Sequence, residues 1–278
     1  MITRLLTQED RDQAKALWLT TFDDPPAFVD WFFDHRYLPE WSAGVFDEGK
    51  LISVIHGAPM ALSAGTTSFR ALMTSGVATV PSERGKGHMY AAMRFLQTYA
   101  QERGVSALFN HPQRPGAYVH LDFRPSTFTK YWQGEGDFLP GEIAPFSEEK
   151  AYQVYSTIAD RYTGFVLRDR DAFHLKMEDY RSDGARGFLL QKAGKTVGYC
   201  VYFYKEDVYG EEVLSLKEYG PILHELQRLS PHKSVSAKLP PDADGAGEIR
   251  AQNVMLASED IWRAMEGSKH PCFCVDEY

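Results

Sequence analysis

The chain has 278 residues, 44% of them hydrophobic and 13% aromatic, which supplies a packed core and excludes disorder as the main state. Its 38 acidic and 30 basic side chains give a net charge of −8, and neither residues 1–140 nor residues 141–278 are basic overall, which excludes a broad electrostatic footprint for nucleic acid. No run of about 18 apolar residues occurs, so no membrane-spanning helix is predicted. Length alone predicts one large domain or two medium ones.

The first residues and the cysteines bear on where the protein works. Residues 1–4 lead directly into a polar segment, which is not typical of a secretory signal. Three cysteines are too few, and odd in number, for a disulfide framework, so a reducing cytoplasm fits. Cys272 and Cys274 would share one face of a strand, and the sequence has no second cysteine pair. We therefore expect buried thiols and no metal site.

The first half of the sequence predicts helices and then a sheet. Thr7, with an acid three residues on, resembles a capping box, and residues 8–22 place apolar side chains at helical spacing. Two prolines, at 25 and 26, end this helix before a second one. The strands expected here are 41–46, 51–57, 59–64, 69–80, 105–109 and 127–132, with a helix from Met89 to about Gly104 and a short helix around Tyr118.

The second half repeats this order broadly. Residues 133–147 contain three glycines and two prolines and interrupt every periodic pattern, so they are the predicted linker between residues 1–135 and residues 136–278. The expected helices beyond it are 148–161, 170–180, 219–229 and 258–265, and the expected strands are 186–192, 196–205, 211–217, 249–256 and 271–276. The pattern predicts an α/β (α+β) protein of two tandem lobes, each a mixed, mostly antiparallel sheet flanked by helices.

A glycine-rich loop with two basic residues joins a predicted strand to the helix that follows. Free N–H groups at a helix start can hold an anion, and Gly85 and Gly87 let the backbone approach it closely. Arg84 and Lys86 add positive charge. The spacing excludes a Walker A loop, and Tyr90 stands where a dinucleotide fingerprint needs its third glycine. The loop predicts a phosphate or pyrophosphate site, with an ordinary strand-to-helix turn as the alternative.

Residues 84–89, Arg-Gly-Lys-Gly-His-Met, resemble the acyl-CoA loop of GNAT-type N-acetyltransferases, Gln/Arg-x-x-Gly-x-Gly/Ala. The match holds at Arg84 and Gly87, and Met89 stands where glycine or alanine is usual. With the preceding Val-Ala-Thr-Val-Pro, the segment is similar to the enhanced-intracellular-survival (Eis) subgroup. The resemblance implies two tandem GNAT-like lobes, the first of which binds acetyl-CoA as acyl donor. The second lobe lacks the loop and is expected not to bind CoA.

The resemblance also implies which residues meet the donor. The strand before the loop would splay from its neighbour and pair with pantetheine, the loop N–H groups would hold the pyrophosphate, and the next strand would end across the splay. The cofactor-binding residues implied in this way are Val77, Ala78, Thr79, Arg84, Gly85, Lys86, Gly87, His88, Met89 and Asn110.

Residues 117–123, Ala-Tyr-Val-His-Leu-Asp-Phe, resemble the family's Phe-Tyr-x-x-x-Gly-Phe segment. Tyr118 matches the tyrosine that protonates the leaving CoA thiolate, a step for which a phenol in hydrogen-bond reach is suited. Asp122 stands where glycine is usual, and a packed core tyrosine is the structural alternative.

The general base is left open by the sequence. In the subgroup that the chain resembles, the base is a C-terminal carboxylate after a sterol-carrier-like domain, for which 278 residues leave no room. The carboxylate of Tyr278, or a neighbouring acid, is therefore a hypothesis, beside the alternative that these charges are merely exposed. His111 and His120 are near the expected site and could assist proton transfer, although lone histidines are usually structural.

The sequence thus predicts an acetyl-CoA-dependent N-acetyltransferase that acts on a primary amine of a small molecule or peptide. An acidic surface concentrates cationic amines such as polyamines, aminoglycosides or lysine side chains, unless the charge serves solubility alone. One alternative is a tandem-lobe aminoacyl transferase, which would use charged tRNA. Another is a non-catalytic acyl-CoA sensor. No nucleic-acid or membrane partner is expected, and the resemblance is compatible with a homo-oligomer.

Overall fold

The computed structural model describes residues 1–113, 115–229 and 234–275. Its strands in the first half are β1 (Ile2–Leu5), β2 (Ala43–Asp47), β3 (Lys50–Ala64), β4 (Thr67–Thr79), β5 (Ala107–Asn110) and β6 (Arg124–Gln133). Those in the second half are β7 (Glu142–Pro145), β8 (Arg186–Lys192), β9 (Lys195–Tyr204), β10 (Val208–Ser215), β11 (Val235–Leu239) and β12 (Glu248–Ala257). The α-helices are α1 (Arg11–Thr21), α2 (Pro26–His35), α3 (His88–Gln101), α4 (Glu148–Ala159), α5 (Arg170–Ser182), α6 (Gly220–Leu229) and α7 (Glu259–Glu266).

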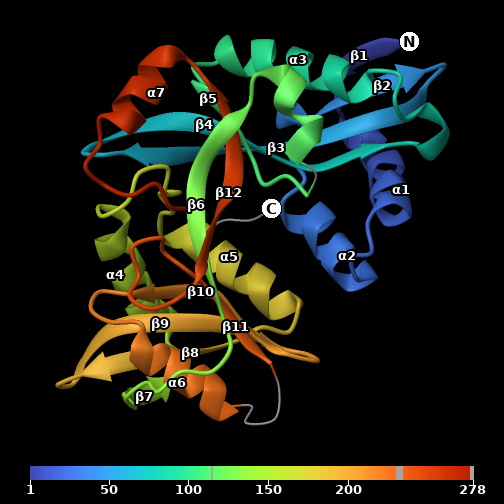
Figure 1. Cartoon of the computed structure of the whole chain (residues 1–278). Helices are drawn as coiled ribbons and strands as arrows, with labels where there is room; N and C mark the ends of the chain where they lie inside the picture. The colour runs from blue at the N-terminus through green and yellow to red at the C-terminus, as the bar shows by residue number, and fades with distance from the viewer. Residues whose placement is uncertain (114, 230–233, 276–278) are drawn as a thin grey trace.

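All described strands belong to one twelve-stranded sheet (Figure 1). Its order is β1-β2-β3-β4-β5-β12-β6-β11-β10-β9-β8-β7. Among the described residues, β4 with β5 and β10 with β11 are the parallel neighbours, and every other neighbouring pair is antiparallel. The predicted α/β class with a mixed, mostly antiparallel sheet is therefore confirmed.

The two halves of the sheet exchange a strand. β12, which comes late in the chain, pairs with β5 and β6, and β6 pairs in turn with β11. Each half thus has a parallel pair (β4–β5 or β10–β11) flanked by an antiparallel strand that comes from the other half. The sheet is continuous across both halves of the chain, so the division into 1–135 and 136–278 remains a prediction about lobes rather than about separate sheets.

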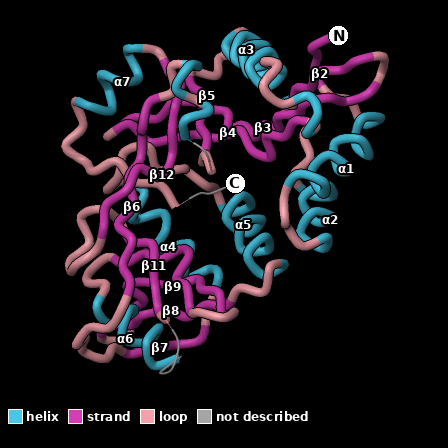
Figure 2. Tube along the Cα trace, turned by 45° about the vertical axis from the view of Figure 1, so that its right-hand side comes forward, coloured by secondary structure: helices cyan, strands magenta, loops and turns pink. Residues whose placement is uncertain are grey.

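Helices cover both faces of the sheet in the same way in each half (Figures 1 and 2). In the first half, Val54 of β3 packs toward α1 and α2, whereas the next residue, Ile55, packs toward α3. In the second half, Tyr199 of β9 packs toward α4 and α5, and Cys200 packs toward α6. Successive strand residues face opposite sides, so alternating apolar residues build two cores on one strand.

Most predicted elements are present, and the capping box is confirmed. The Asp10 carboxylate accepts hydrogen bonds from the backbone N–H of Thr7 (2.8 Å) and from its Oγ1 (3.0 Å). The short helix expected around Tyr118 is a pair of 3-10 turns, Pro115–Ala117 and Val119–Leu121. Three strands were not predicted, namely β1, β7 and β11. Two of them fall in segments interpreted as linker or loop, because four or five residues give too short a pattern.

The strand predicted over 271–276 is wrong in its described part, residues 271–275. It makes a single bridge, from Cys272 to Thr163, and single backbone hydrogen bonds on either side rather than a ladder. Phe273, Cys274 and Val275 are nevertheless buried in succession. The apolar run that suggested a strand is explained by this burial between packed elements.

A buried ion pair stands in the core of the second half. The Arg168 guanidinium donates to both carboxylate oxygens of Glu212 at 3.0 to 3.1 Å, and the two side chains are 3% and 0% exposed. The hydroxyls of Tyr180 (3.1 Å) and Tyr199 (2.5 Å) also donate to this carboxylate. Every charge in the cluster is thus hydrogen-bonded, as a buried ion pair requires.

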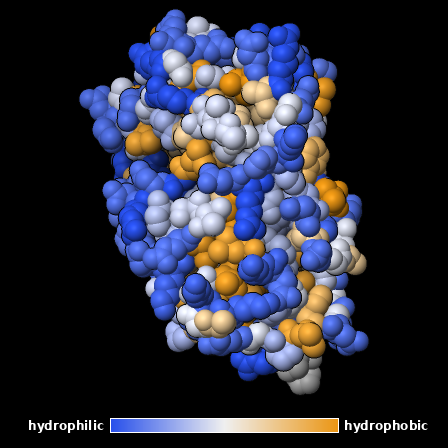
Figure 3. Space-filling view, turned by 90° about the vertical axis from the view of Figure 1, so that its left-hand side faces the viewer, coloured by the Kyte–Doolittle hydropathy of each residue, from blue (hydrophilic) through white to orange (hydrophobic). Residues whose placement is uncertain are grey.

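Within the described residues, no helix is long and apolar enough to cross a membrane. The face drawn in Figure 3 is largely hydrophilic, with scattered hydrophobic groups and a hydrophobic strip near its middle. Exposed apolar groups of this extent are normal on globular proteins.

Candidate active site

The parallel strands β4 and β5 part after four paired residues. Thr74 and Asn110 are the last pair, after which β5 ends while β4 continues to Thr79 beside β3. In the described structure, no strand pairs with the other edge of residues 75–79. The Asn110 side-chain amide donates to the carbonyl oxygen (2.8 Å) and Oγ1 (3.0 Å) of Thr74, and so fixes the point of parting.

A bulge in β4 lies directly after this point. The register shifts so that two residues, Gly76 and Val77, lie opposite the single residue Ile55 of β3. Gly76 has φ +51°, and a Cβ there would lie 2.2 Å from the Trp18 ring. Glycine is therefore required at this position, and the bulge turns the backbone of β4 along the fork.

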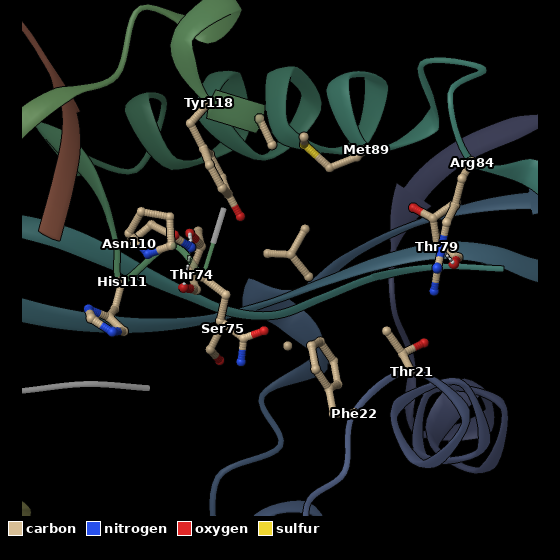
Figure 4. A pocket seen from close by; sticks show the side chains of 15 residues that line it. Thr21, Phe22, Thr74, Ser75, Thr79, Arg84, Met89, Asn110, His111 and Tyr118 are labelled. Carbon is tan, nitrogen blue, oxygen red and sulfur yellow. Dashed lines mark hydrogen bonds between the residues drawn. The ribbon is translucent and has the colours of Figure 1, made fainter. Parts of the chain in front are cut away.

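A cavity of about 340 Å³ opens in the fork (Figure 4). Its walls come from the end of α1, from β4, from the segments after β5 and from the start of α3. The lining residues are Thr21, Phe22, Thr74, Ser75, Gly76, Val77, Thr79, Arg84, Met89, Asn110, His111, Pro112, Gln113, Ala117 and Tyr118.

The glycine-rich loop forms one end of the cavity. Gly85 and Gly87 have φ +77° and +85°, and a Cβ on either would meet no atom within 4 Å. The glycines therefore serve backbone conformation and leave open space, rather than making room for packing. α3 begins directly after Gly87, and no side chain caps its first turn. Open space at an uncapped helix start fits an anion such as a phosphate group.

The basic side chains of the loop have different partners. Arg84 lines the cavity and donates from Nε to the Thr79 carbonyl oxygen at 3.1 Å. Lys86 Nζ and His88 Nε2 instead lie 2.9 Å and 3.2 Å from the two carboxylate oxygens of Glu83, and these contacts lower the pKa of Glu83. The backbone N–H groups and Arg84 are therefore the main features for anion binding, because Glu83 compensates the charge of Lys86.

Tyr118 enters the cavity from the opposite wall, with its hydroxyl directed inward (Figure 4). The side chain is buried and packs edge-to-face on Phe123 at 5.5 Å between ring centroids. Burial raises the pKa of Tyr118 to about 12, and the neighbouring Asn110 side chain acts in the opposite direction. The phenol is therefore protonated at neutral pH. Asn110 Oδ1, which is buried beside it, has no hydrogen-bond partner among the described residues.

Asp122, at the end of the 3-10 turn that follows Tyr118, has the backbone conformation that a glycine would adopt there. Its φ is +62°, the left-handed conformation that glycine adopts readily and that aspartate tolerates better than most residues. Although aspartate replaces the glycine of the family pattern at this position, the backbone conformation expected of glycine is retained.

Five of the predicted donor-binding residues, and Tyr118, line the cavity. The five are Val77, Thr79, Arg84, Met89 and Asn110. Ala78 lies between two of them, but its side chain packs in the core on the opposite face. Gly85, Lys86 and Gly87 form the loop at the end of the cavity, and His88 is the first residue of α3. Tyr278 lies outside the described residues, so its role is untested.

Several cavity residues escaped the sequence analysis. Thr21 and Phe22, at the end of α1, gave no local signal, because their place at the cavity depends on helix packing. Gly76 did give a local sequence signal, since an isolated glycine in a strand pattern often marks a bulge. No group of three or more His, Cys, Asp or Glu side chains in the described part of the chain could hold a metal ion.

The second half has a corresponding fork, and it is filled. β10 and β11 part after Gly210 and Ala237. Directly beyond, Lys238 Nζ donates to Glu211 at 2.8 Å across the gap, and both side chains are largely buried. α6 then begins at Gly220 without a glycine-rich loop before it. Beyond this ion pair, residues 212–215 of β10 pair with β9 alone, as residues 75–79 of β4 pair with β3 alone, but the anion loop of the first half is not repeated in the described residues before α6.

Comparison with known proteins shows which domain family and which solved structures this chain is similar to. Residues 3–126 match the family model of the acetyltransferase (GNAT) domain. No curated protein sequence matches the chain. A probable N-acyltransferase from Enterococcus faecalis V583 aligns with 93% of this chain and 73% of its own, at 15% identity and a TM-score of 0.73.

Two further solved structures have the same fold. Eis1 from Mycobacterium abscessus aligns over 92% of this chain and 74% of its own, at 15% identity and a TM-score of 0.70. A GCN5-related N-acetyltransferase from Anabaena variabilis aligns over 91% and 72%, at 14% identity and a TM-score of 0.72. At these identities the likeness concerns the fold, and it extends over both halves of the chain. Residues 3–126 thus match a GNAT acetyltransferase domain, and the fold of the chain is similar over both halves to that of these N-acyltransferase structures.

Proposed function

We propose that the chain transfers an acetyl group from acetyl-CoA to a primary amine of a small molecule or peptide, with the chemistry in residues 1–135. One juxtaposition carries the proposal. An uncapped, glycine-lined helix start, an unpaired strand edge and a protonated phenol surround a single cavity. These are the parts needed to hold a pyrophosphate, an extended amide chain and a leaving thiolate in one line.

In this proposal the donor lies along β4. The pyrophosphate rests on the loop of Gly85 and Gly87 beside Arg84, and pantetheine amides pair with the open edge of residues 77–79. The thioester then reaches the fork near Gly76, where backbone N–H groups can polarise its carbonyl. The amine attacks, and Tyr118 protonates the departing thiolate.

The acceptor class rests on charge and chemistry. With a net charge of −8, the protein attracts cationic amines and repels nucleic acid, and the filled second fork supports a second half that binds no CoA. The three free thiols fit a protein of the reducing cytoplasm. A homo-oligomer remains compatible with this proposal, and no membrane partner is part of it.

A CoA-release assay with acetyl-CoA and a panel of amines tests the proposal. Polyamines, an aminoglycoside and a lysine peptide represent the acceptor class. We expect amine-dependent CoA release and, by isothermal titration, one CoA site per chain. If no amine is turned over and no CoA binds, the proposal fails. Turnover with charged tRNA in place of acetyl-CoA would favour the aminoacyl-transferase alternative.

Replacing Gly87 by glutamate is expected to weaken CoA binding at least tenfold. The side chain would stand in the open space at the start of α3 and bring negative charge to the pyrophosphate. Gly184→Glu is a matched control, because Gly184 has φ +84° and equally open space but lies between α5 and β8. Both variants carry the same backbone strain. Equal CoA affinity in the two would contradict the assignment of the loop.

The raised pKa of Tyr118 predicts the alkaline side of the rate profile. A phenol with the ordinary pKa of about 10 would be half ionised at pH 10 and would lose half of its proton-donating form. Because burial raises the pKa of Tyr118 to about 12, the protonated form persists below that pH. Steady-state kcat should therefore not fall between pH 8 and 10 through ionisation of this group. A twofold fall at pH 10 that is absent in Tyr118→Phe would show an unshifted phenol.

A further inference from the structure

We propose that Glu83 limits the affinity of the glycine-rich loop for CoA, because it holds the ammonium group of Lys86 away from the pyrophosphate, and that it thereby favours release of the product CoA. The inference rests on the proposed function and adds a positioning residue to its donor site. Three observations support it: the two contacts of the Glu83 carboxylate, the different exposure of their partners, and the position of these side chains at the start of α3.

The Glu83 carboxylate spans the loop that contains the two glycines. Its Oε1 atom accepts a hydrogen bond from Lys86 Nζ at 2.9 Å, and its Oε2 atom lies 3.2 Å from His88 Nε2. Glu83 is the last residue of the 3-10 turn before the loop (Pro81–Glu83), whereas His88 is the first residue of α3. One carboxylate therefore connects the segment before the loop to the helix after it, and also binds the lysine that lies between the glycines.

The two partners of Glu83 differ in exposure. The side chain of His88 is 9% exposed and that of Glu83 is 22% exposed, so their contact fixes the carboxylate against the start of α3. The side chain of Lys86 is 55% exposed, and its ammonium group can turn from Glu83 to a phosphate while it stays in water. Lys86 is therefore the partner that can exchange the carboxylate for an anion, and it must break this ion pair to do so.

The charge of Glu83 gives this exchange a cost. The hydrogen bonds from Lys86 and His88 hold the pKa of Glu83 below its usual range, so the carboxylate is ionised at neutral pH. Arg84 donates instead to a backbone carbonyl oxygen, which leaves its charge available to an anion. Lys86 adds its charge to a bound phosphate only when it leaves Glu83. An exposed ion pair of this kind changes an equilibrium by at most about fivefold.

Restraint of Lys86 affects product release because the pyrophosphate is common to donor and product. Acetyl-CoA and CoA carry the same phosphate groups, so a stronger contact there tightens the binding of both and leaves the barrier of the chemical step unchanged. It also slows the departure of CoA, and product release limits the turnover of many enzymes. A loop that binds phosphate through backbone N–H groups and Arg84, with Lys86 restrained by Glu83, is therefore suited to repeated turnover.

Isothermal titration of Glu83→Gln with CoA tests the inference. Glutamine has nearly the same shape as glutamate but does not attract Lys86 by charge. The dissociation constant of CoA, and its inhibition constant as product, should each fall about three- to fivefold at low salt. The gain should be smaller in 0.5 M salt, which screens exposed charges. A merely structural role of Glu83 predicts the opposite sign, because a loosened loop would bind CoA more weakly.

Glu102→Gln is the matched control for the change in net charge. Glu102 follows the last residue of α3, its side chain is 68% exposed, and the 14 residues of the helix, about 21 Å, separate it from the loop. This distance exceeds the screening length at physiological salt, so the CoA affinity of Glu102→Gln should equal that of the wild type. A gain of the same size in Glu102→Gln and Glu83→Gln would overturn the inference.

A double-mutant cycle shows whether Glu83 acts through Lys86. Lys86→Met alone should weaken CoA binding less than about twofold, because Glu83 already restrains the lysine. When Glu83→Gln is added to Lys86→Met, the affinity should change less than about 1.5-fold. A gain that persists without Lys86 would mean that the carboxylate repels the phosphates directly, and this would overturn the role assigned to the ion pair.

The wild-type protein separates this inference from the function on which it rests. If the wild type binds CoA and Glu83→Gln binds it no more tightly, the inference about Glu83 fails and the proposed function stands. If the wild type neither binds CoA nor turns over any amine, the proposed function fails, and the inference fails with it.

Discussion

Replacing Tyr118 by phenylalanine is expected to lower kcat for acetyl transfer about 1000-fold while leaving CoA affinity close to that of the wild type. General acid catalysis contributes about 10²- to 10⁴-fold, and the phenol is directed into the cavity in its protonated form. Phenylalanine retains the ring that packs on Phe123, so the wall of the cavity should persist. The loss should therefore lie in kcat, because the hydroxyl is used when the thiolate leaves.

Two measurements decide this prediction. Steady-state kinetics give kcat, and isothermal titration gives the CoA dissociation constant. Tyr202→Phe is a matched control, because Tyr202 is as buried as Tyr118, at 7% exposure each, but lies on β9 in the second half. Normal kcat in Tyr118→Phe would mean that this residue only packs. Unaltered CoA binding without any turnover in the wild type would revive the sensor alternative.

The cavity combines features that local sequence reveals with features that it does not. The loop around Gly87 could be predicted as an anion site from residue types at fixed spacing, whereas the segment around Tyr118 was predicted from its resemblance to a family motif. The open edge of β4 could be inferred only from resemblance, because it depends on where β5 stops at Asn110. The contact of His111 with β12 could not be predicted, because its partner Gln252 is 141 residues away in sequence.

Strand exchange is the part of the fold that element order cannot predict. Residues 249–256 were expected to form a strand and do, but nothing local indicates that this strand lies between β5 and β6. The alternation of apolar residues fixes which face is buried and leaves the neighbour undetermined. The second half therefore has a direct part in the cavity, through the contact of β12 with His111, and not merely a supporting one.

Replacing Glu212 by glutamine is expected to lower the free energy of unfolding of the second half by about 3–5 kcal/mol. The substitution keeps the shape of the side chain and removes its charge. The Arg168 guanidinium, 3% exposed, would then be buried without the carboxylate that it binds through two nitrogens. The hydroxyls of Tyr180 and Tyr199 would also lose a charged acceptor. Urea unfolding measured by fluorescence and circular dichroism gives the change.

Two comparisons show whether desolvation is the cause. Glu218→Gln breaks the pair with Lys192 at 3.1 Å, where both side chains are more than half exposed, and should cost at most about 1 kcal/mol. The double variant Arg168→Met with Glu212→Leu removes both buried charges, and apolar replacements of this kind are often neutral. It should therefore be more stable than Glu212→Gln, although it has lost more hydrogen bonds. If the double variant is the less stable of the two, the ion pair itself contributes net stability, and the unpaired charge is not the source of the loss.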